Sequence, residues 1–400
     1  MKLFIRLVKN IGFLSIFADK SIIMANQNLS SAKTTKNDEF YTQFHDIETE
    51  INAYLEYDPN VFRGKTVLLP CDDPEWSNFT KYFAQRFQVL GLKKLISTSY
   101  APDSKRYKYG YQPSLFEQES PQFDISKTQT HGKIFVVDRD VTGDGRVDYQ
   151  DIKWRYLEGD GDFRSKEVCR LRDEADIIVT NPPFSLFREF LTWIMSADKH
   201  FLIIGNINAI GYMCVFPSIK ANKMWLGATN FNTGMYFRVP DNFVYAPTYK
   251  FEKEINGIKV NRVPGVCWYT NMEHGRRHQP LSLMTFAENL RFSRHKEIKG
   301  RKDYIHYENY DAIEVPYVDA IPSDYDGIMG VPRTFLDKYC PEQFEIIGCA
   351  EGESGRELGL KSYPRELKKL NPSLRDGQLY YIENGRPEKP YARILIRKIQ

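Results

Sequence analysis

Four consecutive residues, Asn181, Pro182, Pro183 and Phe184, are the part of this chain best suited to chemistry. Two prolines in a row fix the backbone and keep the carbonyl of Pro182 out of any sheet ladder. That carbonyl and the side-chain oxygen of Asn181 are adjacent hydrogen-bond acceptors, and Phe184 adds a flat apolar face. Together they can bind a planar amine, such as the exocyclic amino group of adenine. The alternative is a plain strand-ending turn, since Asn and Pro are ordinary turn residues.

The elements on either side of this segment favour a binding site. The apolar run 176–180 has the pattern of a buried parallel strand. A short amphipathic helix is expected next, with Phe187, Phe190 and Ile194 on one face. Open α/β sheets bind their ligands at the carboxyl ends of strands, which is where this segment is predicted to lie.

Strand and helix patterns alternate along the chain from Asn37 onward. Helices are expected over 46–57 and 79–90, and strands over 65–70, 94–98, 133–138, 176–180 and 201–205. This alternation predicts an α/β fold with a doubly wound, mostly parallel sheet. Four hundred residues suit two domains, or one large domain with an elaborated end. We expect an N-terminal extension over 1–36, a catalytic domain over 37–272 and a separate C-terminal region over 273–400.

Bulk composition excludes several classes of protein. The net charge of +3 is too small to indicate nucleic acid by itself. The six cysteines form no C-x-x-C pair, so neither a zinc site nor a disulfide framework is indicated, and reduced cytoplasmic thiols are expected. No stretch reaches the ~20 apolar residues of a membrane span. The basic and then apolar segment 1–18 resembles a signal peptide, but it is short and interrupted. We therefore expect residues 1–23 to be an upstream extension before a second start at Met24.

Positive charge is concentrated after residue 272. Between His274 and Lys302 there are eight Lys and Arg residues but only two Glu. Phosphate contacts need cations and base stacking needs aromatic rings, so this composition predicts a nucleic-acid surface. A solvated charged face is the alternative. The interleaved aromatic residues are Phe286, Phe292, Tyr304, Tyr307 and Tyr310. The candidate nucleic-acid contacts are Arg276, Arg277, Arg291, Arg294 and Lys296.

An acidic loop is the one candidate for a metal site. Its spacing nearly fits a calcium loop of the EF-hand kind, with Gly145 at the sixth position. Thr at the third position and Asp at the twelfth weaken the match, and a polar hairpin between two strands is the favoured interpretation. No metal is therefore assigned. The oxygen-bearing residues of the loop are Asp140, Thr142, Asp144, Asp148 and Asp151.

Four blocks, in this order, resemble the EcoRI-type adenine-specific DNA methyltransferases. They are DEFYTQ at 38–43, CDDPEWSNF at 71–79, GDGDFRS at 159–165 and IVTNPPFSLFR at 178–188. The resemblance implies a Rossmann-like sheet that binds S-adenosylmethionine (SAM), followed by a C-terminal target-recognition region. It also implies methyl transfer to N6 of an adenine flipped out of duplex DNA, within or outside a restriction–modification system. A methyltransferase of the same fold acting on an RNA base or a protein glutamine is the alternative, and a catalytically silent DNA-binding protein is a further rival.

The resemblance also assigns roles to residues. Asn181 and the Pro182 carbonyl would accept hydrogen bonds from the target amino group, and Phe184 would stack on the base. The cofactor-binding residues would be Phe40, Tyr41, Thr42, Pro70, Cys71, Asp72, Asp73, Asp162 and Phe163. Of these, Asp162 and Phe163 would bind the cofactor adenine, and capping a helix is the alternative role for one of the carboxylates at 72 and 73. The implied partner is double-stranded DNA bound by a monomer; a cognate restriction endonuclease remains open, with no stable complex implied.

Overall fold

The computed structural model describes residues 41–72, 77–102, 115–147, 149–229, 235–238, 252–255, 258–263 and 265–399. The predicted extension 1–36 and the candidates Phe40, Asp73 and Asp148 lie outside these residues. The chain forms two compact units, one within Met1–Ile207 and Thr229–Met272 and the other within Asn208–Ala228 and Glu273–Gln400. Segment 208–228 thus groups with the second unit, which a single boundary at residue 272 did not anticipate.

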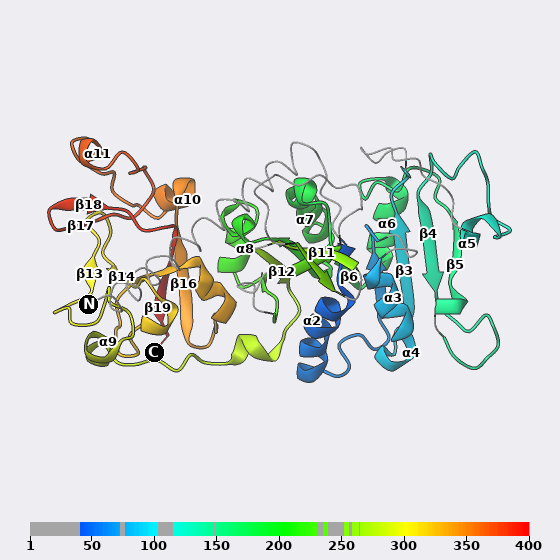
Figure 1. Ribbon diagram of the computed structural model, residues 1–400, viewed down its shortest axis with the longest axis horizontal. Coiled ribbons are helices and arrows are strands. Elements are labelled where there is room, and N and C mark those ends of the chain that lie inside the picture. The colour runs from blue at the N-terminus through cyan, green and yellow to red at the C-terminus, as the bar shows by residue number, and fades with distance from the viewer. Residues whose placement is uncertain are drawn as a thin grey trace, which may run out of the picture. The chain divides into compact units, whose positions relative to one another are not determined.

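The first unit is built on a mixed sheet whose strands run in the order β5-β4-β3-β2-β6-β7-β12 (Figure 1). The strands are β2 (Thr66–Leu69), β3 (Lys94–Ser99), β4 (Lys133–Val137), β5 (Lys153–Tyr156), β6 (Ile177–Thr180), β7 (His200–Asn206) and β12 (Val266–Thr270). Three of these six neighbouring pairs are parallel, namely β3–β2, β2–β6 and β6–β7. The predicted α/β class is confirmed, but the sheet is mixed rather than mostly parallel. The difference arises because β4 and β5 are joined by a loop, and antiparallel strands need no helical crossover.

Amphipathic helices bury their apolar faces against this sheet. The helices are α2 (Phe44–Tyr57), α3 (Asn78–Gln85), α4 (Phe87–Leu90), α5 (Leu115–Gln118), α6 (Lys166–Glu174) and α7 (Phe187–Met195). Alternate strand residues such as Val67, Leu69 and Val179 share one core cluster with side chains of α2 and α3, as the two-residue period of a strand requires. The helix expected over 79–90 is divided at Arg86, which leaves helical geometry with φ −101° and ψ 7°.

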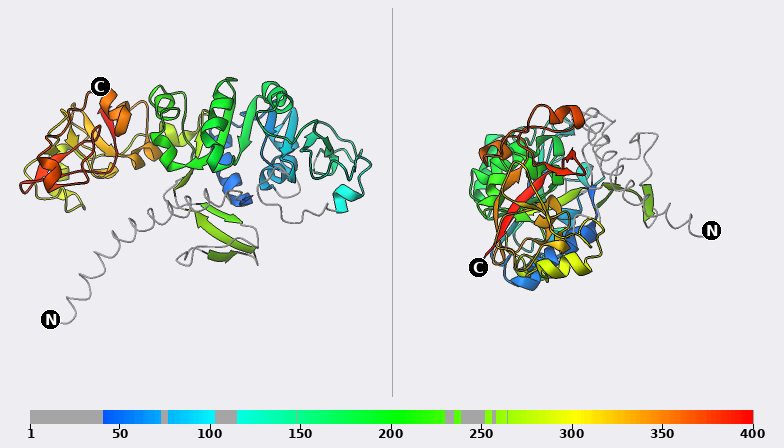
Figure 2. Two further views of the ribbon diagram at one scale, coloured as in Figure 1. Left: turned by 90° about the horizontal axis from the view of Figure 1, so that it is seen from above. Right: turned by 90° about the vertical axis from the view of Figure 1, so that its left-hand side faces the viewer.

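A second, smaller sheet in the same unit has the order β1-β9-β11-β10. Its strands are β1 (Tyr41–Thr42), β9 (Met235–Arg238), β10 (Glu252–Ile255) and β11 (Ile258–Val263). Figure 2 shows the β10–β11 hairpin projecting away from the main sheet. The Tyr41-Thr42 pair of the first motif block is therefore part of a strand that pairs with β9.

The second unit has a five-stranded sheet in the order β13-β14-β15-β19-β16. Its main strands are β13 (Ile305–His306), β14 (Ile313–Glu314), β15 (Met329–Pro332), β16 (Phe344–Ala350) and β19 (Arg393–Lys398), with a hairpin of β17 (Tyr381–Glu383) and β18 (Arg386–Glu388). Its helices are α8 (Phe216–Lys220), α9 (Phe286–Phe292), α10 (Gly352–Glu357) and α11 (Leu367–Leu370). A buried ion pair between Glu314 and Arg393, at 2.5 Å, joins β14 to β19. None of the helices that the structure describes is long and apolar enough to cross a membrane.

Candidate active site

The parallel strands β2 and β6 place two of the motif blocks side by side. Val67 pairs with Ile177 and Leu68 with Ile178, so the two strands end at the same edge of the sheet. Pro70, Cys71 and Asp72 follow β2, and the Asn181–Phe184 segment follows β6. Residues more than one hundred positions apart in the sequence therefore meet where an open α/β sheet binds its ligands.

Asp72 connects these two blocks directly. Its side chain is buried, with 6% of its surface exposed. One carboxylate oxygen accepts a hydrogen bond from the Thr180 hydroxyl at 2.6 Å, and the other accepts from the Ser77 hydroxyl at 2.7 Å. The Asp72 backbone N–H donates to the carbonyl of Thr98 at 3.0 Å. Ser77, not Asp72, caps α3 by accepting from the N–H of Phe79, so the capping alternative does not apply to Asp72.

The Asn181–Phe184 segment turns directly from β6 into helical structure. Pro182 and Phe184 are buried, while Asn181 and Pro183 are half-buried. Phe184 begins a 3-10 turn that continues into α7. Its ring is 8% exposed and belongs to the core cluster with Val179. Stacking on a base therefore requires movement of this ring, or a contact limited to its small exposed part.

The block containing Asp162 lies at the end of β3, one strand along from β2. The N–H of Ala101 donates to the carbonyl of Asp160 at 2.7 Å, and the N–H of Gly132 donates to the carbonyl of Gly159 at 2.9 Å. The contact with the strand is so close that a Cβ at Gly161 would lie 2.3 Å from the Ser99 carbonyl oxygen. Only glycine fits there, and its φ of +83° also favours glycine.

Asp162 is half-buried and forms an ion pair with Arg164 at 2.6 Å. The hydrogen bonds from this guanidinium hold the pKa of Asp162 below its usual value, so the carboxylate is ionised at neutral pH. The Phe163 ring is buried against Phe190 and Trp193, with ring centroids 5.1 and 5.6 Å away. Phe163 thus anchors the loop to α7, and Asp162 presents an ionised acceptor near the edge of the sheet.

The remaining described cofactor candidates lie next to these loops. The Thr42 carbonyl accepts a hydrogen bond from the side chain of Asn78, the first residue of α3, at 2.7 Å. Since α3 begins directly after the Asp72 loop, β1 is held beside that loop. The carbonyl of Pro70 accepts from the Thr98 hydroxyl at 3.0 Å. All four motif blocks are thus connected within the first unit.

Two of the predicted nucleic-acid contacts are packing residues of the second unit. Arg277 is 4% exposed, and its guanidinium lies 3.8 Å from the ring centroid of Trp225. Arg276 pairs with Asp337 at 2.5 Å and donates to the Ala228 carbonyl at 2.6 Å. Prediction from charge clustering was wrong here, because a run of cations does not reveal which of them are buried against segment 208–228.

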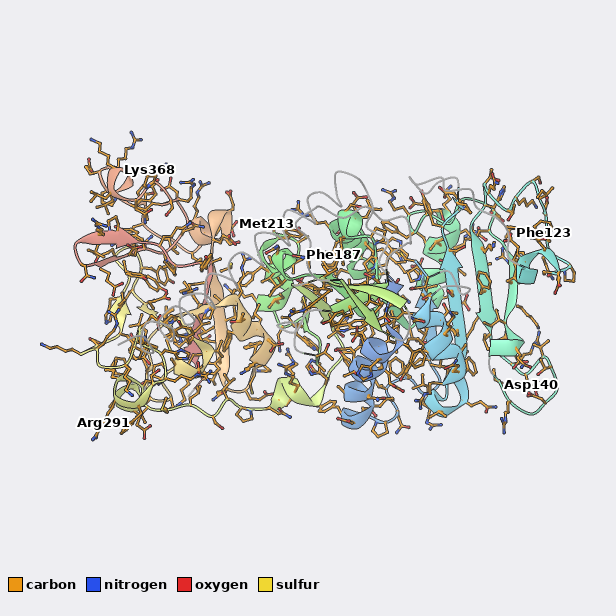
Figure 3. All side chains as sticks on the ribbon, viewed as in Figure 1. Phe123, Asp140, Phe187, Met213, Arg291 and Lys368 are labelled. Atoms are coloured by element: carbon orange, nitrogen blue, oxygen red, sulfur yellow. The ribbon has the colours of Figure 1, made fainter. Side chains whose placement is uncertain are left out.

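Arg291, Arg294 and Lys296 are exposed, as a phosphate-binding surface requires. Figure 3 shows Arg291 on α9, and its guanidinium lies 4.9 Å from the ring centroid of Phe292, which is 58% exposed. Arg294 makes an exposed ion pair with Asp319 at 2.9 Å.

Two of the aromatic residues that follow are not available for stacking. Tyr304 is buried and donates its hydroxyl hydrogen to the Ala320 carbonyl, and Tyr307 is buried against Glu314. Of the aromatic residues interleaved with the basic segment, Phe292 is therefore the one with an exposed ring, since Phe286 and Tyr310 are half-buried.

The acidic loop between β4 and β5 is organised by its own backbone (Figure 3). The Asp140 carboxylate accepts from the N–H groups of Gly143 and Gly145, at 2.5 and 2.8 Å. Asp151, which is buried, accepts from the N–H groups of Val141 and Thr142. Within the described ranges, no three side chains are grouped as a metal site would need. These contacts support the interpretation as a polar hairpin.

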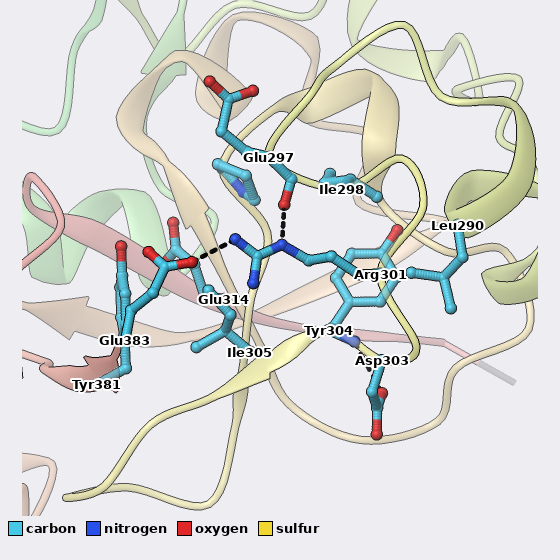
Figure 4. Close-up of a pocket in the computed structure, with 11 residues that line it drawn as sticks. Leu290, Glu297, Ile298, Arg301, Asp303, Tyr304, Ile305, Glu314, Tyr381 and Glu383 are labelled. Carbon is cyan, nitrogen blue, oxygen red and sulfur yellow. Dashed lines mark hydrogen bonds and ion pairs between the residues drawn. The ribbon is translucent and has the colours of Figure 1, made fainter. Parts of the chain in front are cut away.

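The second unit also contains a small cavity, shown in Figure 4. Its volume of about 80 Å³ is bordered by Tyr304, Glu314 and Tyr381, and Arg301 there pairs with Glu383. Such a volume holds several waters, whereas ligand pockets for nucleoside-sized molecules are several times larger. The cavity is therefore not a base-binding site.

Sequence reasoning missed the residues that connect the blocks. Thr180 stood inside a quoted motif and Ser77 inside another, but nothing in their local pattern indicated a shared partner. Gly132 was not noticed at all, because its role depends on the close approach of a loop that lies almost thirty residues further along.

Comparison with known proteins identifies the family. Residues 28–399 match the family described as "Adenine-specific methyltransferase EcoRI". The chain is 40% identical over 336 residues to the Type II methyltransferase M.EcoRI of Escherichia coli, covering 84% of this chain and 93% of that protein. It is 36% identical to M.MpnI of Mycoplasma pneumoniae, over 80% of this chain and 84% of that one. It is 30% identical to M.MgeORF184P of Mycoplasma genitalium, over 93% and 99%. No solved structure matches.

The resemblance inferred from the motif blocks is confirmed by these matches, which span nearly the whole chain. The mixed α/β sheet and the clustering of the blocks at its carboxyl edge agree with it. The chain belongs to the EcoRI family of adenine-specific methyltransferases.

Proposed function

We propose that the protein transfers a methyl group from SAM to N6 of an adenine flipped out of duplex DNA. The observation that carries this proposal is the position of the Asn181-Pro182 acceptors. They lie at the carboxyl end of β6, and the Thr180–Asp72 hydrogen bond fixes them beside the end of β2. A methyl donor and an acceptor amine bound at these two strand ends would be neighbours.

The chemistry of the residues present suits SAM. This cofactor has a cationic amino group and no phosphate, so carboxylates suit it better than a glycine-rich phosphate loop. The β2 end carries Asp72, and the neighbouring loop carries the ionised Asp162. Thr42 lies beside the same loops and would border the methionine end of the molecule. When bound, SAM supplies an electrophilic methyl group on a positively charged sulfur.

The acceptors at β6 address the weakness of the nucleophile. The lone pair of adenine N6 is conjugated into the ring, so the nitrogen attacks poorly. Hydrogen bonds from its two N–H groups to the Asn181 side-chain oxygen and the Pro182 carbonyl raise its electron density. These bonds strengthen as positive charge develops on the nitrogen, so they stabilise the transition state more than the ground state. The surplus proton of the methylated amine then leaves to water, which requires no strong general base.

The target base must leave the double helix, because N6 of a stacked and paired adenine cannot reach a site of this kind. Phosphate contacts would hold the duplex meanwhile, and the exposed Arg291, Arg294 and Lys296 of the second unit are the candidates. Arg276 and Arg277 are withdrawn from this set because both pack within that unit. Phe292 replaces the buried tyrosines as the aromatic group of this surface.

The direct test is incorporation of the methyl group of isotopically labelled SAM into duplex DNA, RNA and protein by the purified protein. We expect labelled N6-methyladenine in duplex DNA alone. Asn181→Ala is expected to lower turnover about 10²–10³-fold, the usual loss for one preorganised hydrogen-bonding partner, with SAM binding retained. Labelled RNA or glutamine with unlabelled DNA would contradict the proposal and favour the alternative substrate.

A further inference from the structure

The hydrogen bonds of Asp72 join parts of the molecule that the mechanism treats separately. Thr180 is the last residue of β6 and directly precedes Asn181, while Ser77 caps the helix that follows the β2 loop. Both hydroxyl groups donate to the same buried carboxylate, at 2.6 and 2.7 Å. One carboxylate thus holds the catalytic segment and the start of α3 in a fixed relation.

The backbone around Asp72 reinforces this connection. Its N–H donates to the carbonyl of Thr98, and the Ser97 hydroxyl donates to its own carbonyl oxygen. Three adjacent strand ends, those of β3, β2 and β6, therefore converge on one residue. Hydrogen bonds to a buried carboxylate are stronger than those between neutral groups, so this arrangement resists small displacements.

We infer that Thr180 and Ser77 are positioning residues that couple cofactor binding to the geometry of the adenine site through Asp72. The inference rests on the proposed function. Thr180 sets the register of Asn181 against the β2 loop, so a cofactor bound at that loop favours the orientation of the acceptors that binds the amine. Coupling of this kind is reciprocal: whatever factor the cofactor contributes to binding of the target adenine, the adenine contributes to binding of the cofactor.

The test uses Thr180→Val, which keeps the shape of the side chain and removes its hydroxyl group. Thr270→Val is the matched control. Thr270 is also fully buried in a strand of the same sheet and donates to a carbonyl, that of Phe201, at 2.7 Å. It pairs with Leu202 near the start of β7, at the opposite edge of the sheet. Thr180→Ser restores the hydroxyl group.

Two quantities separate positioning from simple structural support. The first is turnover against KM for duplex DNA: we expect Thr180→Val to lower kcat at least tenfold with KM for DNA changed less than threefold, because misplacement of reacting groups acts on the transition state. The second is the ratio of DNA dissociation constants without and with S-adenosylhomocysteine. We expect this ratio to exceed one in the unaltered protein and to approach one in Thr180→Val. Thr180→Ser should recover most of both, and Thr270→Val should resemble the unaltered protein.

Near-normal kcat and an unchanged binding ratio in folded Thr180→Val would overturn the inference, as would equal losses in Thr270→Val. If Thr180→Val does not fold, Ser77→Ala carries the test, and an unchanged binding ratio in that variant would overturn the inference. Failure of the proposed function would look different, because the unaltered protein itself would then methylate no DNA.

Discussion

Replacing Gly132 by alanine should weaken cofactor binding although residue 132 lies far from Asp162 in the sequence. Gly132 directly precedes β4, and its N–H and carbonyl both bind the turn that leads to Asp162. Its φ is not in the left-handed region, so alanine suits its backbone conformation. The substitution therefore tests steric contact alone, which Gly161→Ala would confuse with backbone strain.

The size of the effect follows from the contacts a methyl group would make. A Cβ at residue 132 would lie 2.5 Å from the Ser99 carbonyl oxygen, 2.8 Å from the Gly161 Cα and 2.9 Å from the Asp160 carbonyl oxygen. Ordinary contact begins at 3.4 Å, so the first of these requires a displacement of 3.4 − 2.5 = 0.9 Å. The turn is the part that can move, because Ser99 is held in the centre of a sheet. A shift of this size is enough to break the hydrogen bond that Asp162 is proposed to make.

Loss of that bond costs about 1–3 kcal/mol, which corresponds to roughly a fivefold to hundredfold rise in the SAM dissociation constant. Isothermal calorimetry with SAM measures it, and Asp162→Ala gives the effect of removing the carboxylate itself, expected at about tenfold or more. Gly159→Ala is the matched control, since a Cβ there meets nothing within 4 Å. Unaltered SAM affinity in folded Gly132→Ala would refute the reasoning that this contact places Asp162.

Two further predictions concern the second unit. Neutralising Arg291 and Arg294 as glutamines should weaken binding to target and non-target DNA alike and flatten the salt dependence by about one to two phosphate contacts, whereas the equally exposed pair Lys368 and Lys369 on α11 should matter less; filter binding across a salt series decides, and equal effects of both pairs would contradict the assignment. Burial lowers the pKa of His274 to about 4, so the unfolded chain takes up a proton below pH 6.5 that the folded unit refuses until about pH 4. Stability should therefore fall as pH falls through this window, and His274→Gln should show a shallower loss in urea unfolding; an identical pH profile would remove His274 as a cause.

Local patterns were sufficient for the strands that carry the site. The expected strands at 65–70 and 176–180 appear as β2 and β6, because continuous apolar runs bounded by polar residues specify buried strands wherever they pair. The direction of pairing was less accessible. A hairpin and a crossover place the same apolar run in a sheet with opposite directions, and the run itself does not distinguish them.

Side-chain partners were the least predictable part of the site. Arg277 looked like its exposed neighbours, and its burial depends on Trp225, about fifty residues earlier in the chain. The roles of Thr180 and Ser77 depend on a carboxylate supplied by another strand end. Such contacts arise from tertiary packing, so residue type and spacing identified the chemistry of each block but not the bonds that join the blocks.

The central claim is that the Asn181-Pro182 acceptors at the end of β6 direct methyl transfer to adenine N6. Sequencing that detects N6-methyladenine, applied to the DNA of a host otherwise free of this modification, tests it most directly. Expression of the protein should produce N6-methyladenine at one short recurrent sequence, and expression of Asn181→Ala at the same level should produce little or none. Equal methylation with both proteins, or none with the unaltered protein in its folded state, would contradict the account.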